Sequence, residues 1–299
     1  MSIKEKLSIA RVILAEDNPK YTKLIIAKAL EFSRSMFYRI SKIHTRDLVL
    51  YQQMLRIYDE VDDTLGHRKL AKLLGIGKNH ARRTMKETGI VARKRSSKYF
   101  YHGKTNLPPA PNLANQENYR DNFDTGIIYS DIFEFKLLDK TKVRGCFALL
   151  KQTGQALSLV FDYSMNAELV QATISNCMTL NNEEDQRHYL IWHDDQGKQY
   201  GAQLTRDLIL QKGLMHSMSR PGTPTDNPYA ERFVSTFKHS VVRRQGYATF
   251  GDFLDQAERW INFYNNRRPH QTADNLPPNV FAQKYGWPVV PYIYKLTVY

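Results

Sequence analysis

Three acidic residues of the sequence stand at positions where their carboxylates could do chemistry. Asp131 lies within the apolar stretch IIYSDIFEF, Asp195 ends the stretch HYLIWHDD, and Glu231 lies near the start of a predicted helix. A charge inside an apolar strand is unfavourable unless it is paired or bound to a metal ion. Carboxylate oxygens are hard ligands of the kind that Mg²⁺ or Mn²⁺ prefers. On the residues alone, an exposed edge position or a salt bridge explains Asp131 equally well.

The second of these acids has an acidic neighbour, Asp194. Successive side chains on a strand point to opposite faces, so the two carboxylates are not expected to share one role. Thirty-five residues separate Asp195 from Glu231, and 63 separate Asp131 from Asp195. The elements around the three acids must therefore bring together positions that are far apart in the chain.

The positive charge of the chain is concentrated at one end. Residues 1–104 hold 23 Lys and Arg against 10 Asp and Glu, which accounts for the whole net charge of +13. A basic segment of this size favours a polyanion such as nucleic acid over a merely solvated surface. The 299 residues suffice for two domains. No apolar run has the length of a membrane span, and no signal peptide is evident. The two cysteines form no metal-binding pattern, which suits a cytoplasmic protein.

The basic segment is predicted to be helical. Apolar spacing indicates helices over 19–42, broken at 31–33, and over 45–61. Residues 66–90 predict two helices around a Gly-Ile-Gly turn, which is a helix-turn-helix pattern. Residues 92–104 interleave basic and aromatic side chains, as in segments that bind nucleic acid. A solvated helix face and a basic linker with docked aromatics are the alternatives. The candidate DNA contacts here are Lys78, Arg82, Arg83, Lys86, Arg93, Lys94, Arg95 and Lys98.

The rest of the chain predicts a mixed sheet covered by helices. Residues 105–125 are rich in Pro and Asn and are expected to be a linker. Three strands in an antiparallel meander are predicted next, followed by alternating helix and strand and then two long helices. This order is the one that an RNase H-like α/β fold requires. The predicted strands are 126–138, 144–152, 155–164, 187–195 and 214–219, and the predicted helices are 166–180, 201–213, 225–245 and 249–268.

The sequence around the three acids resembles that of one family, the OrfB-type transposases of bacterial insertion sequences. This family belongs to the retroviral-integrase superfamily. The strings HDDQGKQY, SMSRPGTPTDNPYAERFVSTFK and FYNNRRPH match long motifs of that family, and the resemblance covers roughly residues 20–285. It departs from the pattern at Ile128, where the family has an aromatic, and at Asp194, where it has a serine. The family carries a D,D-35-E catalytic triad, and only Asp195 gives the 35-residue gap to Glu231. Asp194 is then expected to point away and to hydrogen-bond or tune the site.

The resemblance implies a fold, a reaction and partners. It implies an integrase-like core over 126–285, preceded by the helix-turn-helix region over 1–104 and followed by a tail over 286–299. Asp131, Asp195 and Glu231 would hold two Mg²⁺ or Mn²⁺ ions for strand cleavage and strand transfer at element ends. Lys238 and Arg268 are expected to contact DNA. The implied partners are double-stranded DNA, further copies of the chain assembled on DNA, and an upstream OrfA-type protein or fusion. The alternative is a non-catalytic regulator that binds element ends, or an inactive domesticated copy of the transposase. A third hypothesis is a nuclease that cleaves DNA without joining it.

Overall fold

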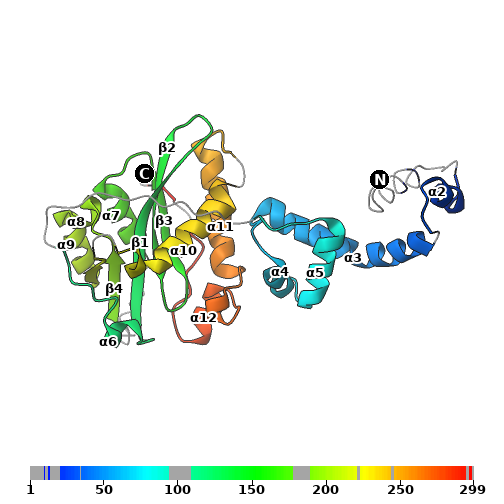
Figure 1. Cartoon of the computed structure of the whole chain (residues 1–299). Helices are drawn as coiled ribbons and strands as arrows, with labels where there is room; N and C mark the ends of the chain where they lie inside the picture. Colours follow the sequence, from blue (N-terminus) through cyan, green and yellow to red (C-terminus); the bar gives the residue numbers. More distant parts are fainter. Residues whose placement is uncertain are drawn as a thin grey trace.

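The structure is a computed structural model in which a helical N-terminal part joins an α/β part built on one sheet (Figure 1). No helix among the described residues is both long enough and apolar enough to cross a membrane. The residues that the structure describes are 10, 13, 21–33, 35–93, 109–177, 189–220, 223–243, 246–293 and 296–297.

Five strands form the sheet, in the order β3-β2-β1-β4-β5. β1 (Thr125–Lys136) pairs antiparallel with β2 (Lys142–Leu150), and β2 pairs antiparallel with β3 (Ala156–Asp162). On the other side of β1, β4 (Tyr189–Asp194) and β5 (Met215–Met218) add in parallel. An antiparallel meander followed by two parallel strands is the RNase H-like topology. The fold class expected from the sequence is therefore confirmed.

Helices cover both faces of this sheet (Figure 1). One face packs against α10, which continues as the π-helix η2, and against α11; the other packs against α7, α8 and α9. The parallel strands β4 and β5 are joined through α8 and α9, as a parallel pair requires. The bounds are α7 Ala167–Asn176, α8 Lys198–Gly201, α9 Gln203–Gln211, α10 Pro228–Phe237, η2 Lys238–Val242 and α11 Phe250–Asn266.

The alternation of side chains along β1 sorts its residues between two cores. Ile127, Tyr129 and Phe133 belong to the core under α10 and α11, whereas Ile128 and Ile132 belong to the core under α7 and α9. Because side chains two residues apart share a face, Asp131 shares the face of Tyr129 and Phe133. The strand therefore directs its only aspartate toward the side of the sheet that α10 covers.

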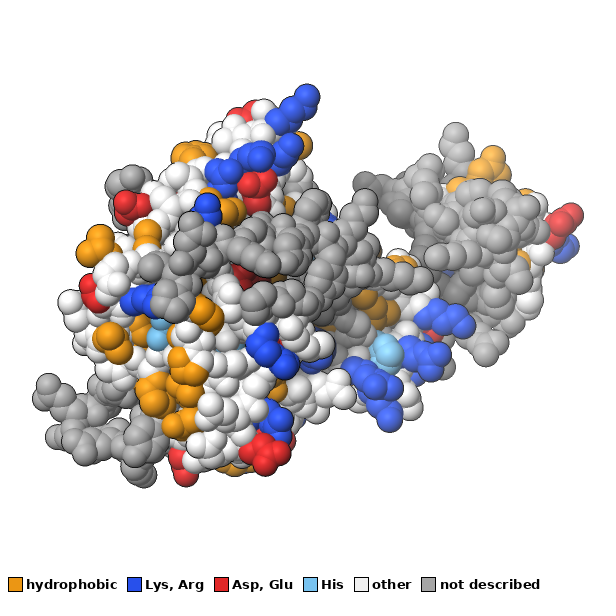
Figure 2. Space-filling model, turned by 60° about the vertical axis from the view of Figure 1, so that its left-hand side comes forward, with side chains coloured by type: hydrophobic (Ala, Val, Ile, Leu, Met, Phe, Trp, Pro, Cys, Tyr) orange, Lys and Arg blue, Asp and Glu red, His pale blue; other side chains and the backbone are white. Residues whose placement is uncertain are grey.

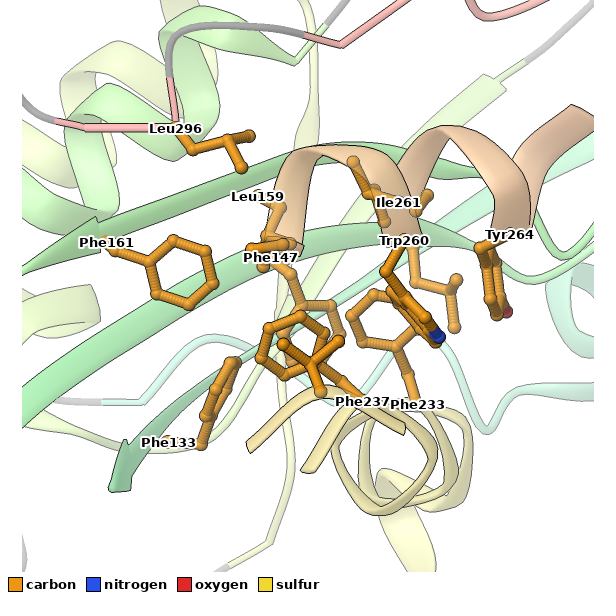
Figure 3. Close-up of a cluster of buried hydrophobic side chains, with 14 of the residues drawn as sticks. Phe133, Phe147, Leu159, Phe161, Phe233, Phe237, Trp260, Ile261, Tyr264 and Leu296 are labelled. Atoms are coloured by element: carbon orange, nitrogen blue, oxygen red, sulfur yellow. The ribbon is translucent and has the colours of Figure 1, made fainter. Parts of the chain in front are cut away.

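Aromatic rings dominate the core between the sheet and α10 and α11 (Figure 3). Phe147 of β2 lies 4.6 Å from Phe233 of α10, between ring centroids, and Phe237 lies 5.2 Å from Trp260 of α11. Rings at these distances add roughly 0.5–1.5 kcal/mol per pair beyond the area that they bury. This packing holds α10 firmly on the strands that carry the acids.

The N-terminal part is helical and has a small core of its own. Four helices are described, and α4 and α5 pack on α3 around Met54, Leu65 and Leu70. The break that we expected near residues 43–44 is absent, because no Gly or Pro interrupts residues 35–60, so one 26-residue helix runs through. The bounds are α2 Lys23–Ala29, α3 Ser35–Glu60, α4 His67–Leu73 and α5 Lys78–Thr88.

The stretches outside the predicted core also pack on the sheet. Residues 109–120, which we expected to belong to a linker, include the buried Ala114 and the short helix α6 (Glu117–Arg120). After α12 (Pro278–Lys284) the tail buries Trp287 and Val290 against the α7–α9 core. Phe161 of β3 donates a backbone hydrogen bond of 2.7 Å to the carbonyl of Leu296. Both stretches thus contribute to the same folded unit as the sheet.

Candidate active site

Asp131 and Asp195 meet at one pocket. Asp131 lies in the middle of β1, opposite Phe147 of β2. Asp195 directly follows β4, which pairs in parallel with β1, so the chain order delivers both acids to the same end of the sheet. They line a pocket of about 280 Å³ together with Ile132, Met165, Gly197, Lys198, Gln199 and Tyr200.

The turn after β4 fixes the Asp195 side chain. Its Oδ1 atom accepts a hydrogen bond of 2.8 Å from the backbone N–H of Gly197. A Cβ atom at position 197 would lie only 2.8 Å from that same Oδ1, so any larger residue there would displace the carboxylate. This accounts for the glycine two residues after the acid in the sequence motif.

The two carboxylates influence each other electrostatically. Burial, and then the nearby charge of Asp195, raise the pKa of Asp131 well above its usual range, with Glu231 acting in the same direction. Lys238 and the backbone N–H of Ile132 oppose this rise. Two acids that destabilise each other's charged forms favour a cation between them. The site therefore suits a positively charged ligand.

Neither Asp194 nor His193 lines this pocket. Asp194 is fully buried, and its Oδ2 atom lies 2.9 Å from His216 Nε2 on β5. Burial raises the pKa of Asp194 to about 7 even though His216 acts against the rise. His193 is also buried, with ring nitrogens 2.8 Å from Ser217 Oγ and 3.0 Å from Ser219 Oγ. Asp194 and Asp195 therefore have separate surroundings, as the strand alternation predicted.

Glu231 lies in the first turn of α10, whose start is tied to the rest of the site. The Nδ2 atom of Asn227, the residue before the helix, donates a hydrogen bond of 3.1 Å to the carbonyl of Ser130, next to Asp131. The preceding Asp226 is 1% exposed and accepts two side-chain hydrogen bonds of 3.0 Å from Arg220. It also accepts hydrogen bonds from the side chains of Asn112 and Asn115.

The two acidic strand positions and the helix acid do not form a complete metal cluster by themselves. Glu231 is exposed, and no group of three His, Cys, Asp or Glu side chains within the described part of the chain is arranged to hold a metal ion. The structure thus brings Asp131 and Asp195 into one pocket and places Glu231 within electrostatic range of Asp131.

Lys238 begins the π-helix that continues α10. Its Nζ atom lies 5.5 Å from the ring centroid of Phe133, two residues beyond Asp131 on β1. Burial lowers the pKa of Lys238, although the charge of Asp131 opposes this. Single π-turns inside α-helices are frequent at functional sites because they re-aim side chains. Here the π-turn begins with Lys238, which interacts electrostatically with Asp131.

The expected DNA contacts on the second helix of the helix-turn-helix lie on one exposed face of α5. Lys78, Arg82, Arg83 and Lys86 are exposed, whereas Ala81 and Thr84 are buried. Positive φ angles at Gly75 and Gly89 form the turn before this helix and its C-cap. Figure 2 shows Lys and Arg side chains gathered over this part of the molecule. The Nη2 atom of Arg83 also lies 3.8 Å from the Oδ2 atom of the buried Asp47 of α3.

The other expected DNA contacts have different outcomes. Arg268 is only 2% exposed, with its Nε atom 2.9 Å from Asp62 Oδ2, so the expected DNA contact is corrected to a buried ion pair. Arg93 is part-exposed and pairs with Asp63 at 2.8 Å. Lys94, Arg95 and Lys98 lie outside the described residues.

The polar residues that support the site were not predicted from the sequence. Asn227 and Asp226 stand in the quoted motif as the pair DN, four and five residues before Glu231, but nothing in their types indicated their hydrogen-bond partners. Asp62 and His216 lie in unremarkable surroundings in the chain and become partners of Arg268 and Asp194 only through the fold. A buried polar pair of this kind has no local sequence signal.

Comparisons with known proteins identify similar families and relatives. Residues 212–278 match the model of a family described as integrase core domain. The chain is 25% identical over 259 residues to the transposase for insertion sequence element IS904 from Lactococcus lactis, covering 84% of this chain and 100% of that protein. It is 26% identical over 232 residues to a protein of insertion element IS600 from Shigella sonnei, covering 75% and 83%.

Among solved structures, the catalytic domain of Mos1 transposase is similar with a TM-score of 0.42 at 13% identity, covering 50% of this chain and 76% of that chain. The relatives from insertion sequences match most of the chain, and the integrase core match spans the segment that contains Glu231. The chain is thus similar over most of its length to proteins of insertion sequences, and these comparisons support an enzyme of the transposase and integrase class.

Proposed function

We propose that this transposase cleaves and joins DNA at the ends of an insertion sequence, with Asp131, Asp195 and Glu231 as its catalytic acids. The observation that carries the proposal is the meeting of Asp131 and Asp195 at one pocket, beside the helix that carries Glu231. A hydrogen bond from Asn227 to the carbonyl of Ser130 ties that helix to β1. Related transposases over most of the chain support the same reaction class.

The donor set of this site fits Mg²⁺ or Mn²⁺. It consists of carboxylate oxygens, which hard divalent cations prefer, and neither buried cysteine, Cys146 or Cys177, lines the pocket. The raised pKa of Asp131 also indicates a place where a cation would be stabilising. Two such ions would supply activation of the attacking oxygen and stabilisation of the leaving oxygen.

The residues of the chain then orient the reacting groups. In the first step a water oxygen forms a bond to phosphorus while the bond from phosphorus to the 3′ oxygen breaks, which leaves a 3′-OH on the element. In the second step that 3′-OH attacks another phosphodiester, and a second 3′ oxygen leaves. Lys238 would hold a non-bridging phosphate oxygen close to Asp131, since its side chain lies beside β1.

The basic face of α5 is the proposed contact for double-stranded DNA at the element ends. Lys78, Arg82, Arg83 and Lys86 are exposed on a helix of the kind that enters a major groove. Since two element ends must be joined, we propose that the chain works as an oligomer on DNA. An upstream OrfA-type protein or fusion is a further proposed partner.

The test is a short duplex that carries the terminal inverted repeat, incubated with the full chain and Mg²⁺ or Mn²⁺. A nick at the end of the element followed by a joined product supports the proposal. Binding without a nick would instead support the alternative, a non-catalytic regulator or inactive copy. Nicking without any joined product would support a nuclease. A chelator must abolish nicking, and nicking that persists in excess chelator would contradict the metal assignment.

A further inference from the structure

One buried acid, Asp62, lies between the helix-turn-helix region and the catalytic part. It follows α3 and is 0% exposed. Its carboxylate accepts hydrogen bonds from Arg268 Nε at 2.9 Å, from Ser240 Oγ at 2.9 Å, and from the backbone N–H and hydroxyl of Thr64 at 3.0 and 2.6 Å. A carboxylate with this many directed partners can occupy only one position without losing some of them.

Further contacts cross the same junction. Arg93 pairs with Asp63 and donates to the backbone carbonyls of His239 and Arg243. Gln256 of α11 donates a hydrogen bond of 3.1 Å to the carbonyl of Glu60, the last residue of α3. Apolar contact is present as well, because the side chain of Phe263 of α11 belongs to the core of the helix-turn-helix region. Rotation of one part against the other would break all of these contacts together.

The partners of Asp62 are on the elements next to the acids. Ser240 lies in η2, which continues the helix that carries Glu231 and begins with Lys238. Arg268 directly follows α11, which packs against α10 through its aromatic side chains. The carboxylate therefore connects the base of the DNA-binding helices with the elements that position the candidate catalytic acids.

We propose that Asp62 is a positioning residue that holds the helix-turn-helix region and the catalytic part as one body, and so fixes the number of base pairs between the recognised sequence and the cleaved bond. This inference rests on the proposed function, because it concerns DNA that is read by α5 and cut at Asp131 and Asp195. An error of about 1 Å in the placement of a reacting group costs as much as 10²-fold in rate. A fixed junction is thus a direct route to precise cleavage.

The first test needs no variant. Two or five base pairs are inserted into the terminal-repeat duplex, between the block protected by α5 in a footprint and the native cleavage site. The full-length chain is expected to nick at an unchanged distance from the protected block, with at least a tenfold loss of nicking at the native bond. If the nick stays at the native bond at an unchanged rate, the inference is overturned. If the unmodified duplex is not nicked at all, the proposed function itself fails.

The second test uses Asp62→Ala, with the exposed Asp59→Ala near the end of α3 as its charge-matched control. Asp62→Ala is expected to spread nicks over several neighbouring bonds, whereas Asp59→Ala keeps a single bond. A role in stability alone would lower the amount of folded protein without moving the nick, and that result would overturn the inference. If Asp62→Ala does not fold, the double variant Asp62→Leu with Arg268→Met removes both charges and is expected to spread the nicks in the same way.

Discussion

Replacing Asn227 with alanine should slow DNA cleavage more than it destabilises the protein. The change removes the hydrogen bond of 3.1 Å to the Ser130 carbonyl, which links the start of the Glu231 helix to the strand of Asp131. Asn227 is 8% exposed, so the carbonyl loses a buried partner, at a cost of about 1–3 kcal/mol in the free energy of unfolding. The aromatic packing of α10 remains, so the protein is expected to fold.

The effect on the reaction is expected to be larger. Without this link, Glu231 can move relative to Asp131, and a displacement of about 1 Å costs as much as 10²-fold in the rate of the chemical step. The metal concentration that gives half-maximal nicking should rise as well, because the proposed metal ligands Glu231 and Asp131 are no longer held at one separation. Both are measured on the terminal-repeat duplex in single-turnover reactions, with urea unfolding of the same samples.

Asn262→Ala is the matched control. Asn262 is 6% exposed and forms two hydrogen bonds of 2.8 Å with the backbone of Ile293, so its loss should destabilise the protein at least as much as Asn227→Ala does. It fastens the tail to α11, away from the acids, and should leave the nicking rate of folded protein nearly unchanged. Equal slowing by the two variants, or wild-type nicking by folded Asn227→Ala, would refute this account of how Glu231 is positioned.

Three further predictions concern pH, salt and packing. Burial raises the pKa of Asp194 to about 7, so the protonated carboxyl is favoured in the folded state and stabilises the protein at low pH. This stabilisation, on the order of 4 kcal/mol in the free energy of unfolding, is lost as the pH rises toward 7. In the presence of a chelator, the Tm of Asp194→Asn should therefore fall less between pH 4 and 7 than the Tm of the wild type. An equal fall in the Tm of both proteins would contradict this. Replacing both Arg82 and Lys86 with alanine should make the slope of log K for duplex DNA against log salt shallower by about 1.8, whereas an unchanged slope would exclude these phosphate contacts. Gly145→Ala should cost about 1–3 kcal/mol in the free energy of unfolding, measured in urea, because its Cβ would lie 2.6 Å from rings of Phe133 and Phe161. Gly251→Ala in α11 should not destabilise, because its Cβ would make only an ordinary contact of 3.8 Å with Thr249 Oγ1.

Strong periodic signals in the sequence predicted most of the catalytic fold. The meander, the two parallel strands and the acids at strand positions all follow from local apolar patterns, and the structure agrees with them. The continuity of α3 was missed because weak apolar spacing suggested a break that no Gly or Pro enforces. The buried hydrogen bonds and ion pairs that support the site could not be predicted from the sequence. Asp62 and Arg268 are 206 residues apart, so only the folded chain reveals that the arginine faces an acid instead of DNA.

Comparing the two adjacent aspartates tests the assignment of the catalytic acids. Nicking of the terminal-repeat duplex in Mg²⁺ is measured for Asp195→Asn and for Asp194→Ser, with folding checked at the same temperature. Asp195 lines the pocket with Asp131, whereas Asp194 is buried against His216. We predict that Asp195→Asn abolishes nicking and that folded Asp194→Ser largely retains it. An active Asp195→Asn together with a folded but inactive Asp194→Ser would contradict the assignment of the catalytic acids.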